Sequence, residues 1–168
     1  MRHLQVLYSV LHLQDKYRVR LNNTVLLKMK MPDSHTFNSE VERTFAFLAD
    51  NGFTVSERVD TSLTAGVTFR GTNVAVSLGL DRRDTCIDCY LTRVVDGDLM
   101  KNDVPGGYWG HLSAFLVKHR GYRGAFKEFK VLDDSLEWYQ AGLLRFAGAL
   151  KNLAPDVVED QPNIFQNT

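Results

Sequence analysis

The chain has 168 residues, of which 44% are hydrophobic and 24% are charged, and its 20 basic residues balance its 20 acidic residues. This size and composition are typical of one globular domain, and the balanced charge argues against a general nucleic-acid binder, which usually carries a basic excess. No run of apolar residues approaches the roughly 18 that cross a membrane, so we expect no membrane partner and a cytoplasmic location.

The apolar and polar residues of positions 1–31 follow a less regular pattern than those of the rest of the chain. The apolar stretch at the N-terminus is similar to that of a signal peptide, but polar residues interrupt it. Two interpretations stay open for this leader. Either Met31 is the natural start, or the leader adds a helix or a strand pair to the fold. The sequence predicts a single domain over residues 32–154, followed by a loose C-terminal tail over residues 155–168.

The first predicted helix covers residues 39–51. Ser39 and Glu42 have the spacing of a capping box, and Gly52 is placed to end the helix. The apolar residues of its buried stripe are Val41, Phe45 and Leu48.

An antiparallel meander of four strands is predicted over residues 53–95, because apolar and polar residues alternate there in one register. The apolar residues face a core, and the opposite face carries small and polar residues. The first strand is less regular, since Glu57 falls on its apolar side. The expected strands are 53–59, Thr64–Arg70, Asn73–Leu80 and Thr85–Leu91.

Two short loops fix the predicted pairing of the later strands. A two-residue loop at Gly71-Thr72 pairs Phe69 with Val74, and Gly71 suits the positive φ of a type II′ turn. A second two-residue loop, Arg82-Arg83, pairs Leu78 with Ile87. Two arginines are poor residues for such a tight turn, so that loop is expected to be longer or bulged.

Two further helices follow the meander and a turn at Asp96-Gly97-Asp98. The second helix is predicted over residues 108–120 with Gly121 as its stop, and the third over residues 134–152 with Asp133 or Asp134 as its cap. The predicted fold class is therefore α+β: an antiparallel four-stranded meander that three helices cover on one face.

The motif Cys86-Ile87-Asp88-Cys89 has the spacing of a metal or redox pair, but it falls inside a predicted strand. Residues three apart on a strand point to opposite faces, so the two sulfurs diverge and do not share a metal ion. His111 and His119 are eight residues apart and do not form an i, i+4 ligand pair either. We therefore predict no metal, no cofactor and no catalytic residue.

Basic and aromatic residues alternate along Lys118–Lys130, for example at Arg120, Tyr122 and Arg123. Such a stretch can stack nucleic-acid bases, dock an acidic protein surface, or pack as an ordinary loop. The residues alone leave these three interpretations open.

The order of a helix, a meander and two helices, with the segment Val74–Leu80 and the helix start Tyr108-Trp109-Gly110-His111, resembles the small α+β immunity proteins of bacterial toxin–immunity systems. The resemblance covers about residues 32–154. It implies tight binding to a cognate toxin domain that blocks the toxin's active site or substrate path. On this basis we expect a non-enzymatic protein-binding protein of the immunity or antitoxin type.

This resemblance transfers no functional residues, so the expected partner contacts are chosen by their charge and aromatic character. They are Arg70, Arg82, Arg83, Asp84, Asp88, Tyr90, Arg120, Tyr122 and Arg123. One alternative is a small-ligand or nucleotide-handling enzyme with a site at the sheet edge, whose candidate residues are Asp88, Tyr90, Arg93 and His111. Another alternative is an RNA-binding module that uses residues 118–130.

Overall fold

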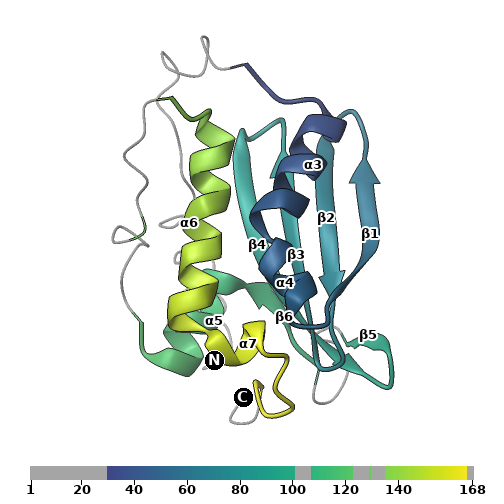
Figure 1. The fold of residues 1–168 in the computed structure, drawn as a ribbon, viewed down its shortest axis with the longest axis vertical. Helices are drawn as coiled ribbons and strands as arrows, with labels where there is room; N and C mark the ends of the chain where they lie inside the picture. The colour runs from purple at the N-terminus through teal and green to yellow at the C-terminus, as the bar shows by residue number, and fades with distance from the viewer. Residues whose placement is uncertain (1–29, 101–106, 123–128, 130–134, 166–168) are drawn as a thin grey trace, which may run out of the picture.

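A computed structural model describes residues 30–100, 107–122, 129 and 135–165 of the chain. It has the predicted α+β class: a curled antiparallel sheet with helices packed over one of its faces (Figure 1). In the part of the chain that the structure describes, no helix has the length and apolar character needed to cross a membrane.

The meander predicted over residues 53–95 is present, and two short strands that were not predicted extend it within the described residues. Strands β1 to β4 follow one another in space as they do in sequence, and β5 and β6 both pair with β4. The strands are β1 (Thr54–Asp60), β2 (Thr64–Arg70), β3 (Val74–Asp81), β4 (Cys86–Val95), β5 (Asp98–Met100) and β6 (Trp109–His111).

The predicted pairing is wrong by two residues, although the two faces of the sheet are as predicted. Phe69 pairs with Val76 instead of Val74, and Leu78 pairs with Cys89 instead of Ile87. The β2–β3 loop and the β3–β4 loop each contain four residues between their last ladder pairs, instead of the predicted two. A longer loop was expected only between β3 and β4. Because side chains alternate with period two, a shift of two residues leaves every side chain on the same face.

Gly71 does not form the predicted type II′ turn, and a different reason explains why glycine occurs there. Positive φ occurs at Gly52, Gly97 and Gly121 among the described glycines, and not at Gly71. Instead, a Cβ at position 71 would lie 2.6–2.8 Å from the carboxylate atoms of Asp160, which packs against this turn. A larger residue would collide with Asp160 here, so glycine is favoured because it has no Cβ. The backbone of Gly71 is not left-handed.

The irregular pattern of β1 is explained by a β-bulge between Val55 and Glu57. Val55 pairs with Phe69 on the core face, whereas Glu57 pairs with Thr68 on the opposite face. The extra residue reverses the alternation, so Glu57 lies exposed rather than buried. Arg58 then returns to the helix side, where its Nε donates to Glu42 Oε1 at 2.6 Å.

The first predicted helix starts earlier than expected and has a break. It consists of α3 (Ser34–Thr44) and α4 (Ala46–Asp50), with Phe45 between them and Gly52 just beyond the end. Asp33, not Ser39, is the N-cap: its Oδ1 accepts a 2.7 Å hydrogen bond from the Thr36 amide. This bond lowers the pKa of the Asp33 carboxyl, because it favours the charged form.

The two later helices are shorter than predicted. Residues 109–111 form β6, so α5 (Leu112–Arg120) starts only after them and ends at the predicted stop, Gly121, which is in the left-handed conformation. Helix α6 (Trp138–Leu153) is capped by Glu137, with Gln140 completing a capping box, so neither Asp133 nor Asp134 is its cap. Helices α3 and α6 lie over one face of the sheet and run roughly along its strands, whereas α5 continues from β6 behind α6 in Figure 1.

The segment expected as a loose tail is folded as far as residue 165. Pro155–Val158 form the short helix α7, and Ile164 and Phe165 are buried. Asp160 reaches the β2–β3 turn, where its carboxylate accepts hydrogen bonds from the amides of Thr72, Asn73 (2.8 Å) and Val74 (3.0 Å). The C-terminal segment therefore fastens one end of the sheet.

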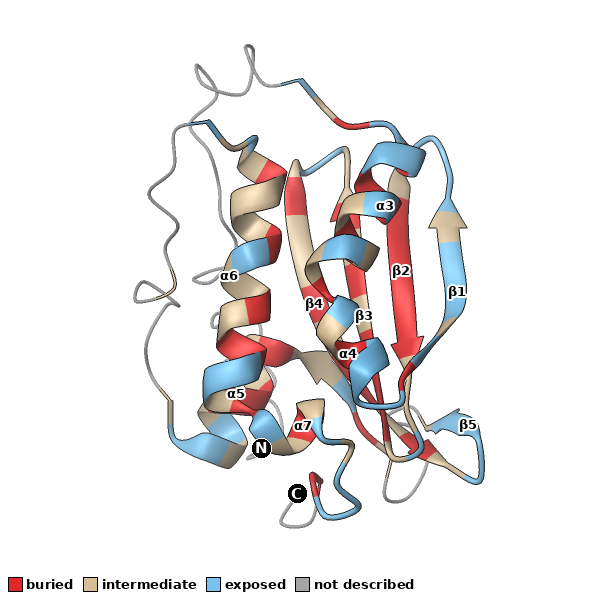
Figure 2. Cartoon of the chain, viewed as in Figure 1, coloured by how far each residue is buried: buried red, intermediate tan, exposed pale blue. Residues whose placement is uncertain are grey.

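The core lies between the sheet and the helices, where the buried surfaces of both layers face each other (Figure 2). Alternate residues of β2, β3 and β4 supply the sheet side, and the helices supply large side chains opposite. Fully buried members include Phe37, Phe45, Leu78, Leu91, Phe115 and Leu143.

Candidate functional site

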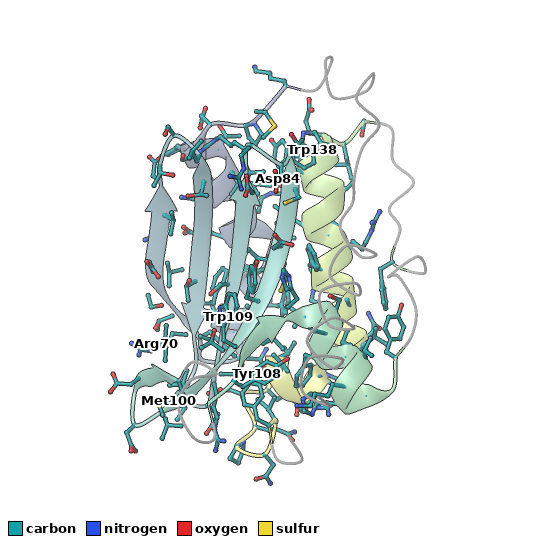
Figure 3. All side chains as sticks on the ribbon, turned by 180° about the vertical axis from the view of Figure 1, so that it is seen from behind. Arg70, Asp84, Met100, Tyr108, Trp109 and Trp138 are labelled. Carbon is teal, nitrogen blue, oxygen red and sulfur yellow. The ribbon has the colours of Figure 1, made fainter. Side chains whose placement is uncertain are left out.

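The face of the sheet opposite α3 and α6 is the candidate functional surface (Figure 3). Paired residues form rows of side chains across it. One row joins Gly66, Gly79 and Asp88, and the next joins Thr68, Ser77 and Tyr90. This is the small and polar composition that the sequence predicts for this face.

A shallow trough of about 310 Å³ runs along this face. Its lining includes Gly66, Ser77, Gly79, Asp81, Asp88 and Tyr90. The two glycines differ in why a larger residue is absent. A Cβ at position 66 would lie 2.8 Å from the carbonyl oxygen of Leu78, whereas a Cβ at position 79 would meet nothing within 4 Å. Gly66 is therefore needed for strand packing, and Gly79 leaves the trough open.

An aromatic cluster stands beside the trough. The rings of Tyr90 and Trp109 are stacked with centroids 4.9 Å apart and planes 12° apart, and the His111 ring lies 4.2 Å from Tyr90. The pairing of β4 with β6 brings them together, because Tyr90 pairs with His111 and Trp109 is the diagonal neighbour. Trp109 is 47% exposed although its position is held by a strand.

A chain of polar contacts runs along β4 next to these rings. Asp88 Oδ1 lies 3.5 Å from Nδ1 of His111, and Asp88 Oδ2 accepts a contact of 3.7 Å from the Cys86 thiol. The side chains of Asp88 and His111 are only 23% and 22% exposed. The carboxylate therefore faces the imidazole at the edge of the trough.

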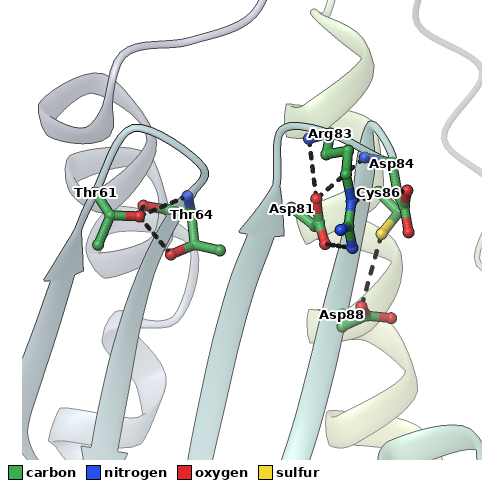
Figure 4. Close-up of polar contacts among 7 residues, drawn as sticks. All are labelled: Thr61, Thr64, Asp81, Arg83, Asp84, Cys86 and Asp88. Atoms are coloured by element: carbon green, nitrogen blue, oxygen red, sulfur yellow. Dashed lines mark hydrogen bonds and ion pairs between the residues drawn. The ribbon is translucent and has the colours of Figure 1, made fainter.

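The β3–β4 turn closes the end of the trough with charged residues (Figure 4). Asp81 Oδ1 accepts hydrogen bonds from the amides of Arg83 (2.9 Å) and Asp84 (3.1 Å). The Arg83 guanidinium lies 3.8 Å from Asp81 and 3.5 Å from Asp84, and it is 73% exposed. On the neighbouring turn, Thr61 Oγ1 accepts from the Thr64 amide at 2.9 Å.

Arg82, although predicted as a partner contact, joins parts of the fold to one another. Its Nη1 donates to the carbonyl oxygen of Thr61 at 2.6 Å, and its Nη2 donates to Ser34 Oγ at 2.8 Å. It therefore ties the β3–β4 turn to the β1–β2 turn and to the start of α3.

The structure gathers some of the other predicted partner residues and separates the rest. Arg83, Asp84, Asp88 and Tyr90 lie on or beside the open face, and Arg70 lies at its other end from Asp84 (Figure 3). Arg123 lies outside the described residues, and the remaining two predicted contacts lie at the end of α5. These two are Arg120, which forms an ion pair with Asp156, and Tyr122, which packs against the core.

Three of the four residues named for an enzyme come together, namely Asp88, Tyr90 and His111. Arg93 pairs with Val74 and so lies on the opposite, core-side parity of β4. Sequence reasoning placed Gly79 on the small-residue face of the sheet but did not name Trp109 as a site residue. Trp109 lies in a strand of only three residues, which is too short to predict from periodicity.

The two cysteines lie on opposite faces of β4, as predicted, and they do not form a disulfide. Both are buried, including Cys86 on the open-face parity. Burial raises the pKa of the Cys89 thiol, and the nearby Asp88 charge raises it further, so this thiol stays protonated. Within the described residues, no three His, Cys, Asp or Glu side chains come together in a group that could hold a metal ion.

Most of the basic stretch Lys118–Lys130 lies outside the described residues. Its described part ends α5, where Arg120 also lies 5.0 Å from the ring centroid of Phe115. In comparisons with known proteins, no family model, no curated protein and no solved structure matches this chain.

Proposed function

We propose that this is a non-enzymatic, cytoplasmic protein-binding protein of the immunity or antitoxin type, which inhibits a cognate bacterial toxin domain. The contact surface is the open face of the sheet. The observation that carries the proposal is Trp109, which is 47% exposed yet held in place by its stack on Tyr90 beside the trough.

Rigid, partly exposed aromatic side chains are typical anchors of protein interfaces. Tryptophan and tyrosine bury a large area on binding, and a side chain that is already ordered loses little entropy. Trp109 has both properties, because the β4–β6 pairing fixes its backbone and Tyr90 supports its ring.

The surroundings of Trp109 fit the surface of a protein partner better than a small substrate. Small side chains at Gly66, Ser77 and Gly79 form a broad and shallow floor, and charged residues of the β3–β4 turn lie at one end. An interface commonly combines a central aromatic anchor with a polar rim. Small substrates usually occupy an enclosed pocket, whereas this trough is shallow and open.

An enzyme is the second candidate function, and the contact between Asp88 and His111 favours it. A carboxylate that orients an imidazole is a common arrangement for a general base, and the Trp109 ring could stack on a nucleotide base. The two candidates separate in a direct test. Calorimetric titration of the purified protein with a nucleotide panel gives no saturable heat if the protein-binding proposal is right.

Neutralisation is the direct test of the proposed function. The C-terminal domain encoded by the neighbouring gene, which this proposal predicts to be the toxin, is expressed in a host cell, alone and together with this protein. We expect growth to stop with the domain alone and to recover with the wild-type protein. We expect Trp109→Ala and Gly79→Val to lose at least ten-fold in affinity for the purified domain, measured by calorimetry.

Leu144→Ala is the matched control, since Leu144 is 37% exposed on α6, away from the open face. We expect this variant to bind as the wild type does. The proposal fails if the wild-type protein neither binds nor neutralises the domain. It also fails if both open-face variants bind as tightly as Leu144→Ala.

A further inference from the structure

We propose that the trough on the open face receives a lysine or arginine side chain from a basic loop of the partner protein. This inference rests on the proposed function, because it names the chemistry by which the same face recognises its partner. Asp81, Asp88 and Tyr90 are the residues that would hold the cationic side chain.

The first support is the charge of the trough. Its described lining residues include two carboxylates, Asp81 and Asp88, and none of them is Lys, Arg or His. Arg83 and His111 approach these carboxylates, at 3.8 Å and 3.5 Å, but neither residue belongs to the lining. The lining therefore has an acidic character inside a protein whose total charge is balanced.

The second support is the acceptor capacity of the two carboxylates. Their side chains are 28% and 23% exposed for Asp81 and Asp88, so water screens them less than it screens surface charges. A carboxylate offers about four lone-pair positions. The contacts from the turn amides, Arg83, His111 and Cys86 leave positions for a further donor.

The third support is the aromatic wall. Tyr90 lines the trough and is stacked on Trp109. The methylene groups of a lysine or arginine side chain can pack against the edge of this ring, which lies between Trp109 and His111, while the charged group reaches the carboxylates. Tyr90 and Asp88 are two residues apart on β4 and therefore share the open face.

The size of the trough favours one side chain over a whole small molecule. A volume of about 310 Å³ is at the lower end of the range for ligand pockets. The missing side chain at Gly79 creates this space, since a Cβ there would meet no atom within 4 Å. A long, straight side chain from a facing loop can lie along such a floor.

The test needs no identified partner. The purified ¹⁵N-labelled full-length protein is titrated with acetyl-Gly-Gly-Arg-Gly-Gly-amide, and a peptide with citrulline in place of arginine is the neutral control of the same shape. We expect saturable shifts of the backbone amides of Gly66, Gly79 and Asp88, and at least ten-fold weaker binding of the citrulline peptide. No saturable shift, or equal binding of both peptides, would overturn the inference.

Two variants locate the site. Asp88→Asn keeps the shape and removes one charge, so we expect at least a five-fold loss of affinity for the arginine peptide. Gly79→Val fills the trough and should abolish binding, whereas thermal melting should show both variants folded. If Asp88→Asn changes nothing, the inference is wrong. If it does not fold, Asp81→Asn and the salt dependence of binding by the wild type decide the question.

The two proposals can fail separately. If Gly79→Val loses the toxin domain but Asp88→Asn and Asp81→Asn bind it as the wild type does, the protein partner stands and the cationic contact fails. If the arginine peptide binds the trough but Gly79→Val still neutralises the domain, the trough recognises cations and the toxin domain docks elsewhere.

Discussion

The two faces of the central sheet are built from the same strands and have opposite character. On the helix side, β3 contributes Val76, Leu78 and Leu80, all of them buried among large apolar residues. On the open side, the same strand contributes Ser77, Gly79 and Asp81 to a trough. The strand backbone is shared, so only the alternation of side chains separates the two functions.

This difference teaches that stability and binding can be changed independently in this protein. Apolar burial against the helices provides the free energy of folding, because it removes large side chains from water. The open face contributes less of that burial, because its buried side chains, such as Ala75, Cys86 and Thr92, are small. Substitutions on one face should therefore change mainly the free energy of unfolding, and substitutions on the other mainly the affinity for a partner.

The largest expected effect tests this difference directly. Leu78→Ala should lower the free energy of unfolding by about 3 kcal/mol, since it leaves a cavity in the core. Trp109→Ala removes a larger side chain but should cost only about 1 kcal/mol, because that side chain is already 47% exposed. Urea unfolding of both variants measures this. Equal losses would mean that the open face is also part of the core.

The next effect concerns the end of the sheet, which belongs to neither face. Asp160→Ala should cost about 2 kcal/mol, because three turn amides lose a charged acceptor. Asp160→Asn is the matched control: it keeps one acceptor oxygen and tolerates the φ of 52° at this position, so it should lose about half as much. Equal stability of Asp160→Ala and the wild type in urea would show that the C-terminal segment adds nothing to the sheet.

A pair of glycines that face each other across β2 and β3 gives a sharper comparison. Gly66→Ala should cost about 2 kcal/mol, because its Cβ would lie 2.8 Å from the Leu78 carbonyl oxygen. Gly79→Ala should change stability by less than about 0.5 kcal/mol, since its Cβ meets open space and the strand gains a better residue. Thermal melting distinguishes them. The same loss at both positions would mean that Gly79 does not leave a trough.

The smallest effect depends on pH and lies on the helical side. Burial, and then the charges of Lys118 and Arg120, lower the pKa of His119 in the folded protein. The unfolded chain therefore binds a proton, as pH falls below about 6.5, before the folded protein does, and stability should decrease there. His119→Gln should reduce this decrease, measured as the difference in urea midpoint between pH 7.5 and pH 5.5. An unchanged difference would assign the pH dependence to other groups.

The sequence predicted which side chains share a face, because that depends only on local alternation. It did not predict the pairing, because the length of the β2–β3 loop depends on Asp160, which lies 88 residues beyond Thr72. It misplaced the first helix start because Asp33 and Ser39 are both chemically suitable caps, and only the packed structure selects Asp33.

The candidate site was predictable only in part for the same reason. Asp88 and Tyr90 follow from the alternation within β4. Trp109 and His111 join them only through the pairing of β4 with β6, which is a contact between segments about 20 residues apart. No local sequence pattern predicts the pairing of β4 with β6.

The bulge in β1 has a consequence beyond the direction of its side chains. β1 is the outer strand of the sheet, and an outer strand offers unpaired backbone groups to any other extended chain (Figure 1). The bulge at Val55–Glu57 distorts that row, and Glu57 and Arg58 add charge beside it. Natural proteins use such features to prevent edge-to-edge association. A variant with Ser56 deleted should present a flatter edge and aggregate at concentrations at which the wild-type protein remains dispersed.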